Sequence, residues 1–246
     1  MSSRLCLNPR QQADELNRVL YRIRAAAQRA PRVLFDLDGT LIDNRPRTAA
    51  IFTRLAERWA SSYPELAAGL GNAAPGALVF SVRENLARMG VSDPERVLEA
   101  LEFWKDHFFF DELLVHDVPA PGALEFARQT YQAGATLVYF TGRDLPNMAL
   151  GTLRSLRDAG FPIGVPGVEL VLKPDADTHD FEYKKAMMRE VERGGEVVAG
   201  FDNEPMNCNL FKRSFPRADV YLLDTGHLPN APELDPEIRV LGSFVT

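Results

Sequence analysis

Two aspartates stand two positions apart where a short apolar run ends in a glycine turn, within Val33-Leu34-Phe35-Asp36-Leu37-Asp38-Gly39-Thr40-Leu41. Residues two apart on a β-strand point to the same side, so the carboxylates of Asp36 and Asp38 can converge on one ligand at the strand end. Gly39 permits the turn, and the Thr40 hydroxyl can tie it by a hydrogen bond to the backbone. This pattern outlines a phosphoryl-transfer site, because a simple solvated turn does not require these five specified residues.

The D-x-D-G-T pattern of residues 36–40 resembles the first motif of the haloacid dehalogenase superfamily of hydrolases. In that family the first aspartate is the nucleophile and the second is the general acid and base, which assigns these roles to Asp36 and Asp38. The phosphatases and phosphomutases of the family carry the second aspartate, whereas its dehalogenases lack it. The presence of Asp38 therefore argues against cleavage of a carbon–halogen bond.

A second strand end supplies a hydroxyl group and a turn. The apolar run 138–140 leads into Thr141, Gly142, Arg143 and Asp144. Backbone amides of such a turn, before a helix, can bind a phosphate. A serine or threonine at the position of Thr141 resembles the second motif of the family, which binds the transferring phosphoryl group. Arg143 and Asp144 can instead pair with each other at a helix start.

A third strand end supplies another acid. The apolar run 197–201 leads into Asp202, Asn203 and Glu204, and Asp202 resembles the acid of the family's fourth motif. With the carboxylates of the first motif, it completes an oxygen site for a hard cation. Relatives commonly place a second acid directly after the first or four positions later, where this chain has Asn203 and Met206. Three interpretations of the second acid stay open. Glu204 takes its place, Asn203 holds a metal-bound water instead, or the motif of this chain has no second acid.

The third motif of the family needs a lysine, whose charge screens the repulsion between the carboxylates and the phosphate. Lys173 follows the apolar run 168–172 and resembles the Lys-Pro form of some relatives, although Ala176 replaces their second proline. Lys184 lies near the start of a predicted helix over 180–193, as in phosphatases whose lysine opens that helix. The apolar stripe of this helix continues three, four and seven residues later, at Met187, Met188 and Val191. Helical spacing therefore favours Lys184 over Lys173.

The elements around these motifs predict an α/β fold, a Rossmann-like parallel sheet with helices on both faces. From Pro121 onward, apolar runs typical of buried parallel strands alternate with helical patterns. Helices are predicted over 122–133, 145–158, 180–193 and 206–213, and strands over 136–141, 168–172, 196–201 and 219–223. Ligands of such sheets bind beyond the carboxyl ends of the strands, which is where the motif residues stand.

Between the first motif and Pro121, helical patterns continue for about eighty residues, which is longer than a simple crossover requires. An all-helical insert at this point resembles the cap domain that many members of the superfamily place between their first and second motifs. We therefore expect a core over residues 31–45 and 119–246, with a helical cap over 46–118. An N-terminal helix within residues 1–30 starts at an Asn8 cap and precedes the core.

Composition excludes several classes of partner. The net charge is −6 and no block of basic residues occurs, so neither nucleic acid nor an anionic membrane surface is expected as a partner. No apolar run approaches the roughly 18 residues of a membrane-spanning helix, and the first thirty residues lack an apolar signal core. The cysteines Cys6 and Cys208 lie far apart in sequence and fit a reduced, cytoplasmic protein. No pattern predicts the oligomeric state.

The resemblance implies hydrolysis of a small phosphomonoester with Mg²⁺, through an aspartyl-phosphate on Asp36. The metal ligands would be Asp36, Asp202 and Asp38, the last through its backbone carbonyl. The groups that bind the phosphate would be Thr141, Gly142 and Lys184. Two alternatives stay open. One is a phosphomutase that uses the same residues, and the other is a catalytically idle binding or scaffold protein, supported only by the incomplete fourth motif.

Overall fold

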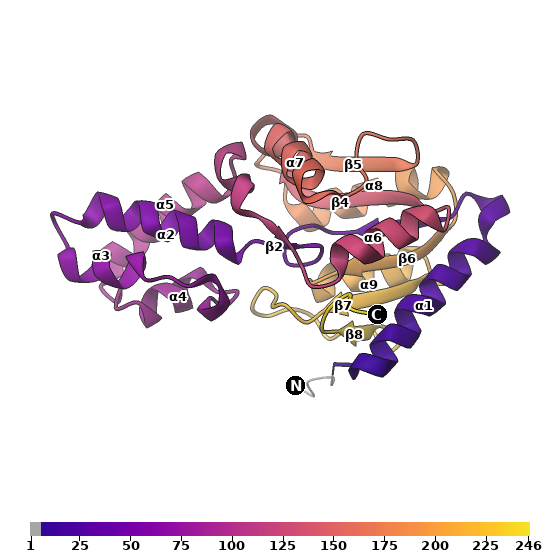
Figure 1. The fold of residues 1–246 in the computed structure, drawn as a ribbon, viewed down its shortest axis with the longest axis horizontal. Helices are drawn as coiled ribbons and strands as arrows, with labels where there is room; N and C mark the ends of the chain where they lie inside the picture. Colours follow the sequence, from indigo (N-terminus) through magenta and orange to yellow (C-terminus); the bar gives the residue numbers. More distant parts are fainter. Residues whose placement is uncertain (1–5) are drawn as a thin grey trace. The chain divides into compact units, whose positions relative to one another are not determined.

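A computed structural model of the protein describes residues 6–246, and residues 1–5 of the predicted N-terminal segment lie outside the described residues. The chain divides into two compact units (Figure 1). The first comprises the chain up to Ile42 together with Pro119–Pro146 and Leu156–Thr246. The second comprises Asp43–Val118 and Asn147–Ser155. Each unit is packed around hydrophobic clusters of its own residues.

The first unit is built on a six-stranded parallel sheet in the order β5-β4-β1-β6-β7-β8. Its strands are β1 (Arg32–Phe35), β4 (Thr136–Asp144), β5 (Val168–Lys173), β6 (Val197–Asp202), β7 (Asp219–Leu223) and β8 (Arg239–Leu241). Phe35 of β1 is in register with Tyr139 of β4 on one side and with Phe201 of β6 on the other. The carboxyl ends of these three strands therefore meet at one edge of the sheet.

Alternate residues of the strands face two different layers of helices, as the pleat of a strand requires. Val33 and Phe35 pack in one core with apolar residues of α1 and α6, whereas Leu34 packs in another core with residues of α8 and α9. These helices are α1 (Pro9–Ala25), α6 (Ala123–Gln132), α8 (Asp180–Arg193) and α9 (Pro205–Ser214). Figure 1 shows α1 and α6 in front of the strands. The predicted α/β fold with both faces covered is confirmed.

The elements of the first unit follow the predicted ones, with three differences. α1 starts after the predicted Asn8 cap but ends at Ala25, because a 3₁₀ turn over Ala27–Arg29 and a left-handed Ala30 break the helix. β4 extends to Asp144, beyond the predicted end at residue 141. β8 was not predicted, since its three residues carry too short an apolar pattern. The helix over 145–158 is found as α7 (Leu145–Ala159), of which Asn147–Ser155 belongs to the second unit.

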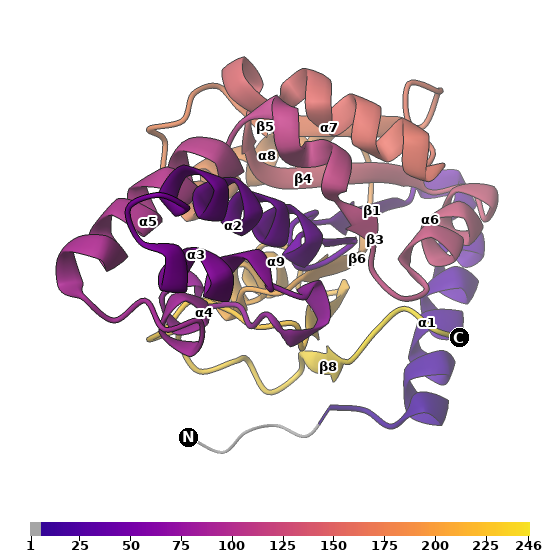
Figure 2. The same ribbon diagram turned by 60° about the vertical axis from the view of Figure 1, so that its left-hand side comes forward.

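The second unit is helical (Figure 2). It contains α2 (Arg45–Trp59), α3 (Pro64–Gly71), α4 (Val82–Arg88) and α5 (Pro94–Phe108). Phe52, Leu86 and Val97 belong to its largest cluster. The sequence missed α3, a helix of eight residues whose two glycines weaken any helical signal. Two further strands, β2 (Ile42–Asp43) and β3 (Val118–Pro119), pair with each other in a separate sheet.

Within residues 6–246, no helix combines the length and the hydropathy that crossing a bilayer requires.

Candidate active site

The candidate site lies in the first unit, at the carboxyl edge of the sheet. Asp36 directly follows β1, Thr141 lies near the end of β4, and Asp202 is the last residue of β6. β1 stands between the other two strands, and the Asp36 amide donates a hydrogen bond of 3.0 Å to the Phe201 carbonyl. This bond continues the ladder between β1 and β6 by one residue. The ladder therefore brings Asp36 of the first motif beside Asp202 of the fourth.

Lys184 joins these two carboxylates. Its Nζ lies 2.8 Å from Oδ1 of Asp36 and 2.9 Å from Oδ2 of Asp202, and its side chain is 1% exposed. Lys184 shares the buried face of α8 with Met188 and Val191, as the helical spacing predicted. Lys173 lies elsewhere, because its Nζ donates to the backbone carbonyl of Thr178 at 2.9 Å. Of the two candidate lysines, the structure brings only Lys184 to the carboxylates.

The cluster around Lys184 carries more negative than positive charge. Asp180, in the first turn of α8, is a third carboxylate, 3.8 Å from the Lys184 ammonium. Burial raises the pKa of Asp36 and of Asp202, although the Lys184 charge opposes both shifts. Burial alone would lower the pKa of Lys184, but the three carboxylates outweigh it and hold that pKa well above its usual range. Such an excess of carboxylate favours the binding of a further cation.

Asp38 is held by Arg143, a residue whose role the sequence left undecided. Nε of Arg143 lies 2.6 Å from Oδ2 of Asp38, and Nη2 lies 3.0 Å from Oδ1. The Arg143 side chain is 2% exposed, whereas that of Asp38 is 25% exposed. The backbone N–H of Arg143 also donates to the Thr141 hydroxyl at 3.2 Å. One residue of β4 thus contacts both the second aspartate and the candidate phosphate-binding threonine.

The two glycines of the motifs are needed for close packing. Gly39 has a φ of +77°, and a side chain there would collide with Asn203. At Gly142 a Cβ would displace the carboxylate of Asp180. The Thr40 hydroxyl donates to Oδ2 of Asp36 at 3.2 Å, so Thr40 supports the aspartate itself. These contacts fix the turn that carries the first motif.

Besides Lys184, the Asn207 side chain contacts the carboxylate of Asp202. Its Nδ2 lies 3.2 Å from Oδ1 and 3.1 Å from Oδ2 of Asp202. Glu204 contributes its backbone N–H to Oδ1 of Asp202 at 2.8 Å, while its carboxylate accepts the Leu228 N–H at 3.0 Å. Burial raises the pKa of Glu204 to about 7. The sequence analysis did not identify Asn207, which lies five residues after Asp202. Pro205 could have indicated it, because a proline at the start of a helix places Asn207 in the first turn of α9.

Mg²⁺ fits the donors present, although not through three carboxylates. Within the described part of the chain, no cluster of three or more His, Cys, Asp or Glu side chains is arranged to hold a metal ion. The carboxylates of Asp36 and Asp202 share one ammonium, while that of Asp38 is turned to Arg143. The donor set is therefore the hard oxygens of Asp36 and Asp202, with the backbone carbonyl of Asp38 as the expected third ligand. The excess negative charge of the cluster agrees with a cation at these oxygens.

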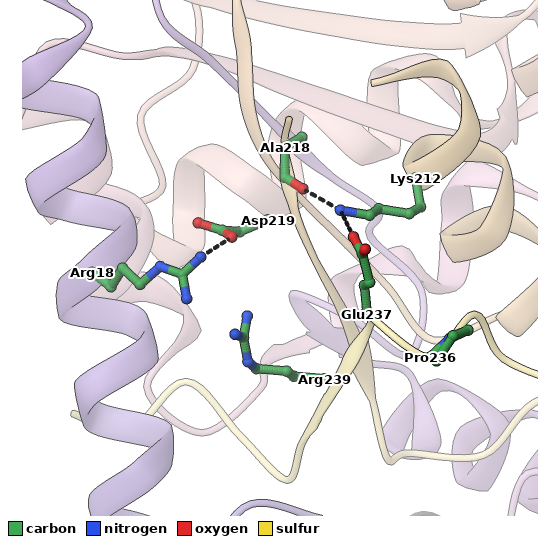
Figure 3. A pocket seen from close by; sticks show the side chains of 7 residues that line it. All are labelled: Arg18, Lys212, Ala218, Asp219, Pro236, Glu237 and Arg239. Carbon is green, nitrogen blue, oxygen red and sulfur yellow. Dashed lines mark hydrogen bonds and ion pairs between the residues drawn. The ribbon is translucent and has the colours of Figure 1, made fainter. Parts of the chain in front are cut away.

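A pocket of about 280 Å³ lies at the amino ends of β7 and β8, at the opposite edge of the sheet from Asp36 (Figure 3). It is lined by Arg18, Lys212, Ala218, Asp219, Pro236, Glu237 and Arg239. Arg18 of α1 pairs with Asp219, and Lys212 of α9 pairs with Glu237 at 2.7 Å. None of the motif residues lines this pocket. Its ion pairs instead connect α1 to β7 and α9 to the segment before β8.

Comparisons with known proteins show the family and the fold of the chain. The family profile described as haloacid dehalogenase-like hydrolase matches residues 32–188, more than half of the chain. A putative phosphatase from Clostridium difficile superposes with a TM-score of 0.51 at 14% identity, over 85% of this chain and 93% of that one. A HAD-superfamily hydrolase of subfamily IA, variant 1, from Geobacter sulfurreducens gives a TM-score of 0.50 at 16% identity, over 87% and 93%. At such identities the structures share the fold alone. No curated protein matches the chain significantly.

Proposed function

Because the chain belongs to the haloacid dehalogenase-like hydrolases, we propose that it hydrolyses a small phosphomonoester with Mg²⁺ through an aspartyl-phosphate on Asp36. One observation carries the proposal: the Lys184 ammonium bridges the carboxylates of Asp36 and Asp202 at adjoining strand ends. A buried carboxylate at that position has a fixed orientation and a counter-ion beside it. Both properties suit a nucleophile that attacks a charged phosphate.

The proposed reaction has two steps that use the same two aspartates. Asp36 attacks phosphorus, so that an Asp36–phosphorus bond forms and the ester P–O bond breaks; the leaving oxygen keeps the electron pair and takes a proton from Asp38. Asp38 then accepts a proton from water, whose oxygen bonds to phosphorus while the Asp36–phosphorus bond breaks. The products are an alcohol and inorganic phosphate.

Charge stabilisation is most of what phosphoryl transfer requires of a protein. Lys184, the Thr141 hydroxyl and the Gly142 amide are the proposed donors to the phosphoryl oxygens. When bound to Asp36, Asp202 and the backbone carbonyl of Asp38, Mg²⁺ supplies further positive charge for those oxygens. The ammonium of Lys184 and a bound Mg²⁺ would together offset the excess of carboxylate in the cluster.

A panel of phosphate esters tests the proposal by the release of inorganic phosphate. With Mg²⁺ present, we expect wild type to hydrolyse at least one ester and Asp36→Asn to release none, since it removes the nucleophile and nearly conserves the shape. Cooperative thermal unfolding of the variant serves as the control for folding. EDTA should abolish the activity, and added Mg²⁺ should restore it.

Other outcomes of the same panel select the alternatives. Full activity after exhaustive chelation would exclude the metal assignment. Activity of Asp36→Asn close to that of wild type would exclude Asp36 as the nucleophile. Isomerisation that depends on a sugar bisphosphate, without phosphate release, would identify a phosphomutase. A wild type inactive on every ester would favour a binding or scaffold protein.

A further inference from the structure

The pairing of Asp38 with Arg143 is not needed to bind a phosphate or a metal, yet it is one of the most closely defined contacts of the site. Both oxygens of Asp38 are engaged, one by Nε and one by Nη2 of the same guanidinium. Such a two-point contact fixes the plane of a carboxylate as well as its distance, because the guanidinium is planar. A single lysine ammonium provides a charge but no such plane.

Asp38 and Arg143 differ in how deeply their side chains are buried. Asp38 stands in the turn after β1, and a quarter of its side chain is exposed. Arg143 belongs to β4, the strand next to β1, and its side chain is buried. The buried arginine thus constrains the more exposed aspartate. A carboxylate that transfers a proton must lie within hydrogen-bond reach of the leaving oxygen, so its orientation affects the rate directly.

We infer that Arg143 is a positioning residue, which orients the Asp38 carboxylate for proton transfer to the leaving group. The inference rests on the proposed function, and it assigns Arg143 an effect that depends on the substrate. An ester with an acidic leaving group departs with little help from a proton donor. An ester with a basic leaving group needs that proton, so its hydrolysis depends on the orientation of Asp38.

Two esters of similar size distinguish these cases, p-nitrophenyl phosphate with an acidic leaving group and benzyl phosphate with a basic one. The quantity to compare is kcat/KM, which reports the steps up to departure of the leaving group. In Arg143→Ala we expect kcat/KM to fall about a hundredfold for benzyl phosphate and less than about tenfold for p-nitrophenyl phosphate. Asp38→Ala should show the same bias towards benzyl phosphate.

Arg32 provides a matched control. It is another buried arginine of the same sheet, 4% exposed, at the amino end of β1. Two nitrogens of its guanidinium donate hydrogen bonds to the carboxylate of Glu169. Arg32→Ala therefore removes a comparable ion pair far along the strands from Asp38. It should lower the melting temperature without changing the ratio of kcat/KM for benzyl phosphate to kcat/KM for p-nitrophenyl phosphate.

Arg143→Lys keeps the charge but loses the planar contact. It should therefore lower this ratio as much as Arg143→Ala does.

The outcomes separate this inference from the proposed function. An active wild type with equal losses on both esters in Arg143→Ala would overturn the positioning role and indicate that Arg143 binds the phosphate. Restoration of the wild-type ratio by Arg143→Lys would also overturn it, since charge alone would then suffice. If Arg143→Ala fails to fold, Arg143→Lys decides alone: a lowered ratio supports the role and an unchanged ratio refutes it. A wild type inactive on these two esters and on every other ester of the panel would refute the proposed function and this role with it.

Discussion

Lys184 is the residue on which the charge balance of the site depends. It is the cation found between Asp36 and Asp202, and Asp180 lies close enough to add to the negative charge. Removing one member of a buried ion pair leaves an uncompensated charge, which costs about 3–5 kcal/mol in typical cases. Lys184 therefore contributes to the stability of the fold as well as to the proposed chemistry.

Lys184→Ala should lower kcat at least about a hundredfold, which is the scale of loss when one preorganised charge-stabilising group is removed. It should also lower the melting temperature, because the carboxylates of Asp36 and Asp202 lose their shared partner. Steady-state kinetics on the best ester of the panel and thermal unfolding measure the two effects.

Lys173→Ala is the matched control for that prediction. Its Nζ contacts a backbone carbonyl in the loop before α8, so its loss should affect kcat much less. A greater loss of kcat in Lys173→Ala than in Lys184→Ala would transfer the role of the third motif to Lys173.

The sequence identified residues whose position follows from a strand end or a helical stripe. Asp36, Thr141 and Asp202 stand at the ends of neighbouring strands, and Lys184 lies on the buried face of its helix. Arg143 was ambiguous because an arginine next to Asp144 can pair locally. Its actual partner is more than a hundred positions away in the chain, and only the register of β1 against β4 brings the two together.

At the scale of elements, α1 is fastened to the sheet by charge as well as by apolar contacts. Leu16, Val19 and Ile23 bury one face of the helix in the core. On the same turns of the helix, Arg18 and Arg22 both pair with Asp219, the first residue of β7. The side chain of Asp219 is 8% exposed, so this contact is better shielded from water than a surface ion pair.

Asp219→Asn should lower the free energy of unfolding by about 1–2 kcal/mol, between the values for exposed and buried ion pairs. The substitution conserves the shape and removes only the charge that the two arginines share. Chemical denaturation followed by circular dichroism measures the change.

Glu190→Gln is the control for Asp219→Asn, because Glu190 pairs with Arg193 on the exposed surface of α8. Exposed pairs contribute little, so this variant should differ from wild type by less than about 0.5 kcal/mol. Equal effects of the two substitutions would show that α1 is held by its apolar face alone.

Long apolar patterns made most elements predictable, and short elements were missed. The strands over 136–141 and 219–223 were recognised because their apolar runs are bounded by helical patterns. β8 has three residues, and it is placed by pairing with β7 and by burying Val240 and Leu241 in the two cores. α3 contains Gly69, which lies against the carbonyl of Met89, a contact that no local pattern encodes. Tertiary packing decides such short segments.

At the scale of the whole molecule, two units with separate cores share one chain. The clusters around Phe35 and Leu34 consist of residues of the first unit, and that around Phe52 consists of residues of the second. The chain leaves the first unit after Ile42, a few residues beyond Asp38, and returns at Pro119. The inserted segment Asp43–Val118 is therefore tethered at two points, one of them close in sequence to Asp38, and Asn147–Ser155 joins the same unit from a later part of the chain.

Replacing residues 46–118 with a short Gly/Ser linker should leave a folded sheet, because the two cores of the first unit use none of these residues. If the insert acts as a specificity lid that excludes water and bulky esters, its removal should weaken selection against bulky substrates. Hydrolysis of p-nitrophenyl phosphate should be less impaired. The measurement is the ranking of kcat/KM over the ester panel, with circular dichroism as the control for folding.

An unchanged ranking in a folded variant would contradict the lid. An interaction or assembly role for the insert would then be the better hypothesis.

The order of the strands also bears on how the protein is made. β1, which leads into Asp36, is synthesised early, but its partners are Tyr139 and Phe201 and their neighbours, far later in the chain. Contacts so distant in sequence form slowly, whereas the helices of the second unit contact one another locally and can fold during synthesis. Their early folding would shorten the effective loop between β1 and β4. β1, the strand that leads into Asp36, therefore lacks its partner on one side until β6 has been synthesised.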